Sequence, residues 1–151
     1  MTSSVLELLQ DRADRDAVLL LARTHRLGED QFVTWDLPKD PAVVVTARAL
    51  VARQLAAWNA EDMTFATQVG ASELVTNAIR YGESPIRLRL LRDQSLICEV
   101  SDGSSTAPHL RYAQTTDEGG RGLFMTAELT QRWGTRYTQR GKTIWTEQKF
   151  A

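Results

Sequence analysis

From residue 31 onward, the spacing of hydrophobic and polar residues divides the chain into strand-like and helix-like segments. Residues 31–37 place three large apolar side chains among polar ones, which predicts a strand. Asp40 and Pro41 then favour a helix start, because Asp caps a first turn and Pro fits within it. Apolar residues follow at helical spacing, namely Val44, Ala47, Val51, Leu55 and Trp58.

A second helix is expected over residues 63–81, closed by Gly82. Glu73 and Asn77 lie one turn apart on one face of this helix, with Arg80 beside them. An acid and an amide in this arrangement could place a general base and a metal ligand over one substrate, but a solvated polar face has the same spacing. On a helical wheel they flank a mostly apolar arc of Val69, Ala71, Ser72, Val75, Ala78 and Ile79.

The pattern changes after Pro85. Residues 86–91 alternate between apolar and mostly basic side chains, which predicts a strand with one basic face. Residues 96–100 are nearly all apolar on one face and predict a second strand. Residues 101–118 have no clear period, and a loop of that length inside a compact domain is usually functional or mobile.

The last third of the chain predicts a helix over residues 123–133, ended by Gly134, and a hairpin. The hairpin joins residues 135–138 to residues 143–148 through the Arg-Gly pair at 140–141. The order of elements predicts an α/β protein of the α+β type. We expect a two-layer sandwich whose mixed, mostly antiparallel sheet is covered on one face by helices.

The first 30 residues differ from the rest. Residues 4–11 suit a short helix, residues 17–22 form an apolar run that suits a buried strand, and residues 24–30 are polar and suit a linker. We therefore expect an N-terminal arm over residues 1–30 and one domain over residues 31–151. A chain of 151 residues fits that single domain.

Charge and composition exclude several classes of partner and site. The net charge of −1 creates no field that would attract nucleic acid or acidic lipid. No apolar run approaches about 18 residues and no signal-peptide pattern is present, so we expect a cytoplasmic protein without a membrane partner. Cys98 is the only cysteine and there are two histidines, which argues against an internal disulfide and a zinc site.

Two further clusters could carry chemistry. Asp102 and Gly103 follow directly after the strand expected at 96–100. A carboxylate at a strand end can accept a hydrogen bond from an exocyclic amine, and a neighbouring glycine lets a flat ring approach the backbone. A plain Asp-Gly turn has the same sequence, so this cluster alone leaves both interpretations open.

The other cluster is the Gly-Gly-Arg-Gly segment at 119–122, which opens a predicted helix. Free backbone N–H groups and the positive end of a helix dipole suit a phosphate there, and Arg121 could add a charge. A flexible linker into a helix is the alternative. The segment is not a P-loop, since no Gly-Lys-Ser/Thr follows, and it lacks the dinucleotide-binding context.

Taken together, the order and spacing of the three clusters resemble the N, G1 and G2 boxes of the GHKL, or Bergerat, ATP-binding fold. Histidine kinases, gyrase-type ATPases and bacterial anti-sigma-factor serine kinases share that fold. The matching segments are ELVTNAIRYG at 73–82, VSDG at 100–103 and GGRGL at 119–123.

The closest likeness is to the small anti-sigma-factor kinases. Their typical Leu-x-x-x-Trp-Gly segment is similar to residues 129–134, and their Gly-Lys-Thr-x-Trp segment is similar to residues 141–145. The resemblance covers about residues 32–149. It implies the Bergerat fold with ATP and Mg²⁺ as cofactors.

The resemblance also implies residue roles. Glu73 would be the catalytic base that takes the proton of a substrate serine. Asn77 would hold Mg²⁺ between the phosphates. Asp102 would bind the adenine amine, with Gly103 beside it and Thr143 nearby through water. These roles fit phosphoryl transfer, which depends on positioning and charge neutralisation.

The segment at 104–118 would be the ATP lid in this resemblance. The family often has a histidine a few positions after the N-box asparagine, where this chain has Arg80 and Tyr81. This departure bears on turnover more than on binding. The G2 box would wrap the phosphates through Gly120, Arg121, Gly122 and Leu123.

The N-terminal arm has a resemblance of its own. Residues 15–24 are similar to the final strand of SpoIIE-like PP2C phosphatases, although Arg15 replaces one acid of their usual acidic pair. This likeness implies a C-terminal piece of a longer phosphatase–kinase regulator, without phosphatase activity in this chain. An apolar arm that packs on the domain or on a second copy is the alternative, and it would favour a homodimer.

Two functions follow as expectations. The first is an ATP-dependent protein serine/threonine kinase that phosphorylates an anti-sigma-factor antagonist in a bacterial partner-switching pathway. The second is a nucleotide-sensing module that sequesters a sigma factor or an antagonist without significant turnover.

Overall fold

The computed structural model describes residues 26–104 and 130–150. One short 3-10 turn, η1, precedes the first strand, and another, η2, directly precedes the second of the two described α-helices. The elements are η1 Glu29–Gln31, β1 Phe32–Leu37, α2 Val43–Ala57, η2 Glu61–Met63, α3 Thr64–Tyr81, β2 Ile86–Arg92, β3 Ser95–Asp102, β4 Arg132–Thr138 and β5 Gly141–Lys149.

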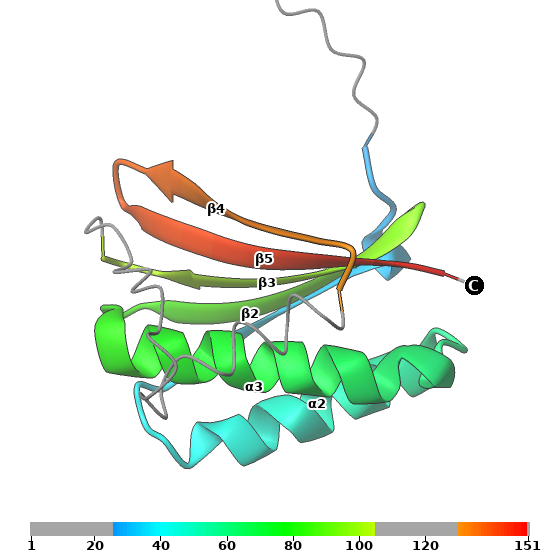
Figure 1. The fold of residues 1–151 in the computed structure, drawn as a ribbon, viewed down its shortest axis with the longest axis horizontal. Helices are drawn as coiled ribbons and strands as arrows, with labels where there is room; N and C mark the ends of the chain where they lie inside the picture. The colour runs from blue at the N-terminus through cyan, green and yellow to red at the C-terminus, as the bar shows by residue number, and fades with distance from the viewer. Residues whose placement is uncertain (1–25, 105–129, 151) are drawn as a thin grey trace, which may run out of the picture.

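The described strands form one five-stranded sheet in the order β1-β2-β3-β5-β4. Every described strand pair is antiparallel. Figure 1 shows α2 and α3 packed together on one face of this sheet, with α3 against β2, β3 and β5. The expected antiparallel sheet with helices on one face is confirmed, and the described part contains no parallel pair.

The core lies between α3 and the helix-facing side of the central strands. In β2, Ile86, Leu88 and Leu90 are fully buried, whereas Arg87 on the opposite face is exposed. Strand β3 continues the buried face with Leu96, Cys98 and Val100. Alternate residues of these two strands are therefore buried, as the alternation in the sequence predicts.

Helix α3 is rotated slightly from the arc predicted on the helical wheel. Ala71, Val75 and Ala78 are buried as expected, but Leu74 is buried too. The other predicted arc members, Val69, Ser72 and Ile79, are only half-buried.

The helix expected over residues 123–133 is wrong at its C-terminal end. Arg132, Trp133 and Gly134 belong to strand β4, and Gly134 pairs with Trp145 of β5. A Cβ on Gly134 would lie 2.7 Å from Cζ2 of Trp145, so the glycine makes room for the indole inside the strand. The rest of that expected helix lies outside the described residues.

Two other expectations reach beyond the described part. The loop expected at 101–118 begins later, because Ser101 and Asp102 extend strand β3. Residues 105–118 lie outside the description, as do residues 1–25 of the expected N-terminal arm. Among the described residues, no helix is long and apolar enough to cross a membrane.

Cys98 offers a direct test of the core packing. Burial raises the pKa of its thiol from the ordinary 9.0 to about 12, and the charge of the adjacent Glu99 adds to the increase. Above about pH 9 the unfolded chain loses this proton and the folded chain keeps it, so stability should fall as pH rises toward 12. We expect urea denaturation between pH 8 and 11 to show this fall.

The matched control is Cys98→Ala, which removes the titrating group and should flatten the part of the pH dependence that Cys98 causes. Iodoacetamide at pH 8 should label the parent chain only when it unfolds. Rapid labelling of the folded chain, or identical pH profiles for parent and variant, would contradict a buried Cys98.

Candidate functional site

Asp102 ends strand β3 on the helix-facing side of the sheet, two residues after the buried Val100. Its side chain is 2% exposed. One carboxylate oxygen, Oδ1, accepts a hydrogen bond from the Ser104 backbone N–H at 2.9 Å. The same oxygen accepts a second hydrogen bond from Lys142 Nζ at 3.2 Å, which is also an ion pair. Asp102 is therefore a buried carboxylate with one oxygen doubly engaged.

Lys142 comes from the adjacent strand. It is the register partner of Asp102 in the β3–β5 ladder, and its side chain is 3% exposed. A buried charge is costly unless it is paired, so the ion pair explains how both groups remain inside the protein. Lys142 has no predicted role in the sequence, because its position opposite Asp102 follows only from the strand register.

Three glycines surround Asp102. Gly82 ends α3, and a Cβ there would lie 2.5 Å from Cγ of Asp102. Gly103 donates its N–H to the carbonyl of Glu83 at 2.6 Å. Gly141 begins β5 with a φ of 150°, and a Cβ there would overlap the carbonyl oxygen of Asp102. The end of α3, the end of β3 and the start of β5 thus meet closely around one carboxylate.

Glu73 and Asn77 lie on α3, and both are half-buried. Within the described part of the chain, neither side chain has a hydrogen bond or an ion pair. Asn77 lies in the last turns of the helix, which ends at Gly82 against Asp102. One helix therefore carries the predicted base and the predicted metal ligand, and the C-terminal end of that helix lies against the carboxylate.

Thr143 does not lie on the side of Asp102. It follows Lys142 in β5 and pairs with Ser101 of β3, and successive residues of a strand point to opposite faces. The structure thus brings Lys142, rather than Thr143, to the carboxylate. Gly103 is beside Asp102 as predicted.

Most of the residues predicted for the phosphate end of the site lie outside the described part of the chain. Of the expected lid, only Ser104 is described. The G2-box residues Gly120, Arg121, Gly122 and Leu123 lie outside the described residues. No group of three or more Asp, Glu, His or Cys side chains within the described ranges could form a metal site by itself.

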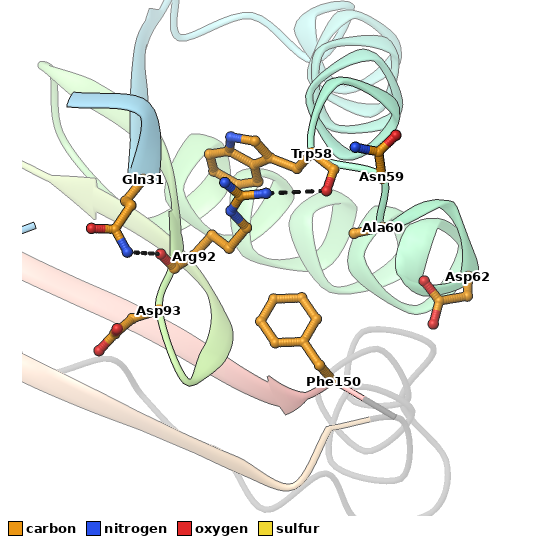
Figure 2. Close-up of a pocket in the computed structure, with 8 residues that line it drawn as sticks. All are labelled: Gln31, Trp58, Asn59, Ala60, Asp62, Arg92, Asp93 and Phe150. Atoms are coloured by element: carbon orange, nitrogen blue, oxygen red, sulfur yellow. Dashed lines mark hydrogen bonds between the residues drawn. The ribbon is translucent and has the colours of Figure 1, made fainter. Parts of the chain in front are cut away.

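A shallow hollow of about 380 Å³ lies at the opposite end of the sheet, where β2 turns into β3 (Figure 2). Its wall includes Arg92, whose guanidinium lies 5.4 Å from the Trp58 ring centroid and donates to the Trp58 carbonyl at 3.1 Å. Phe150 closes another side. The hollow contains neither Asp102 nor α3 residues 73 and 77, so it is separate from the candidate site.

Comparison with known proteins gives one positive finding. Residues 37–147 match the family model described as histidine kinase-like ATPase domain. That match spans most of the chain and includes every described residue of the candidate site. No curated protein matches the sequence.

The close backbone packing around Asp102 predicts the effect of Gly141→Ala. Alanine at this φ would be strained, and its Cβ would overlap the Asp102 carbonyl oxygen. We therefore expect the unfolding free energy to fall by at least about 1–3 kcal/mol. Urea denaturation measures this loss. Arg140→Ala, at the neighbouring exposed position, is the control and should change stability by less than about 0.5 kcal/mol. Equal effects of the two variants would contradict the proposed packing.

Proposed function

The chain belongs to the histidine kinase-like ATPase domain family, and from that membership we propose that it binds ATP with Mg²⁺. We further propose that it acts as a protein serine/threonine kinase. The substrate would be an anti-sigma-factor antagonist, and the pathway a bacterial partner-switching one.

The observation that carries the proposal is the state of Asp102. Both of its hydrogen bonds end on Oδ1, and no described residue donates to Oδ2. A carboxylate oxygen accepts hydrogen bonds, and the exocyclic amine of adenine would supply a donor to Oδ2. Gly82, Gly103 and Gly141 let the backbone pack closely around Asp102, because a Cβ on any of them would overlap a neighbouring atom.

Asn77 and Glu73 would serve the phosphate end. Asn77 presents an amide oxygen, a ligand type that Mg²⁺ accepts alongside phosphate oxygens and water. Bound Mg²⁺ would neutralise phosphate charge. Glu73 has no described partner, so its carboxylate is free to accept the proton of a substrate hydroxyl.

The transfer itself would be a single displacement. The substrate serine oxygen forms a bond to the γ-phosphorus, the bond from that phosphorus to the β–γ bridging oxygen breaks, and ADP leaves. The serine proton goes to Glu73. The chain contributes positioning and charge, which are the main requirements of phosphoryl transfer.

A nucleotide-sensing module without significant turnover is the alternative function. The exposed Tyr81, 65% accessible at the end of α3, favours it. Arg80 and Tyr81 occupy the positions at which related ATP-binding proteins often have a histidine. Such a module would bind ATP or ADP and sequester a sigma factor or an antagonist.

Nucleotide binding is tested first with Asn77→Ala. Thermal unfolding of the parent chain should shift upward with Mg-ATP, because a ligand at about 100 times its Kd stabilises a fold by roughly 2.7 kcal/mol. The shift should shrink in Asn77→Ala and should depend less on Mg²⁺. The variant Arg53→Ala, at an exposed position of helix α2, is the control. Absence of any shift in the parent at millimolar nucleotide would refute ATP binding.

Glu73→Gln separates the two functions. The amide keeps the size of the side chain but cannot take a proton, so phosphate transfer to an antagonist protein should fall by about 10²-fold to 10⁴-fold. The thermal shift with Mg-ATP should remain. Unchanged transfer in Glu73→Gln would exclude Glu73 as the base. Absence of transfer by the parent, with intact ATP binding, would favour the sensing module.

A further inference from the structure

Lys142 is the one member of the buried pair for which the proposed function gives no role. Its ammonium group has three N–H donors. Asp102 Oδ1 accepts one of them at 3.2 Å, and no other described residue accepts a hydrogen bond from Nζ. Two donor hydrogens therefore remain without described partners at a side chain that is 3% exposed. Such an arrangement is costly and indicates that a further acceptor belongs beside Nζ.

The ion pair between Lys142 and Asp102 indicates what that acceptor is, because it sets a donor beside a carboxylate. Both described hydrogen bonds to the carboxylate end on Oδ1, so within residues 26–104 and 130–150 the pair offers Oδ2 as an acceptor and the remaining N–H groups of Lys142 as donors. The edge of adenine that carries the amino group presents the complementary pair, an N–H donor next to the ring nitrogen N1, which is an acceptor.

We infer that Lys142 is a specificity-determining residue that donates directly to adenine N1 while Asp102 Oδ2 accepts from the adenine amino group. This inference rests on the proposed ATP binding. Two residues that face each other across β3 and β5 would then each form one hydrogen bond with the base. A purely structural Lys142 would neutralise Asp102 without any contact to the base.

The register makes Lys142 suited to this position. Strand pairing fixes the backbones of Asp102 and Lys142 opposite each other, and the ion pair fixes the end of the lysine chain. Gly141, with a φ of 150°, starts β5 directly before Lys142 and packs on the Asp102 backbone. The donor is thus held in place before any nucleotide arrives, which reduces the entropy lost on binding.

The test compares the full chain with its Lys142→Met variant by calorimetry, using ATP, 1-deaza-ATP and purine riboside triphosphate. 1-Deaza-ATP carries a C–H in place of N1 and loses only the proposed lysine contact. Purine riboside triphosphate lacks the amino group and loses only the proposed Asp102 contact. Met has nearly the length of Lys and no donor.

For the parent chain we expect ATP to bind roughly 10-fold to 100-fold more tightly than 1-deaza-ATP, the range for a hydrogen bond with a charged donor. In Lys142→Met this ratio should fall to within about threefold. The preference for ATP over purine riboside triphosphate should persist in both proteins. A parent ratio near one, or a large ratio retained in Lys142→Met, would overturn the inference.

The same experiment separates failure of this inference from failure of the proposed function. If the parent binds none of the three nucleotides, the proposed ATP site itself is refuted. If Lys142→Met does not fold because Asp102 is left unpaired, the double variant Asp102→Asn/Lys142→Met keeps the site neutral. The ratio of ATP to 1-deaza-ATP affinity should again be within about threefold there, and a larger ratio would contradict a role for Lys142.

Discussion

The structure depends on the pairing of β3 with β5, which sets Asp102 opposite Lys142. Removing two charges from water costs several kcal/mol per ion, and only close contact offsets that cost. Here the contact is 3.2 Å and both side chains are almost fully buried. A one-residue slip of β5 would turn Lys142 to the open face and leave the Asp102 carboxylate buried without its cation. The register is therefore fixed by charge as well as by apolar packing.

Helix α3 connects this pair to the hydrophobic core. The buried side of this helix, which packs on the sheet, includes Ala71, Leu74 and Val75. Glu73 and Asn77 are half-buried. Its last residue precedes Gly82, which packs against the Asp102 side chain. The same packing that stabilises the fold thus positions the proposed base, metal ligand and adenine acceptor.

Local patterns in the sequence predicted most of the described fold. The alternation in β2 and the helical spacing in α3 are strong because one face of each is buried. The pattern failed at Trp133 and Gly134, where pairing with β5 and the size of the Trp145 ring override a helix-like spacing. Local spacing has no information on such a contact.

For the candidate site, local patterns predicted only which residues stand at the end of a strand. A carboxylate and a glycine were expected after a strand; in the structure Asp102 is the last residue of β3, and Gly103 donates its N–H to the Glu83 carbonyl. Lys142 could not be found in this way, because its partner is 40 residues distant and is reached only through the ladder. Nor could spacing alone show that Thr143 points away from Asp102.

The most direct test of the account is a crystal structure of the full chain with a non-hydrolysable ATP analogue and Mg²⁺. Adenine should lie beside Asp102, with its amino group within hydrogen-bond distance of Oδ2. Nucleotide bound elsewhere, for example in the hollow beside Trp58 and Arg92, would contradict it.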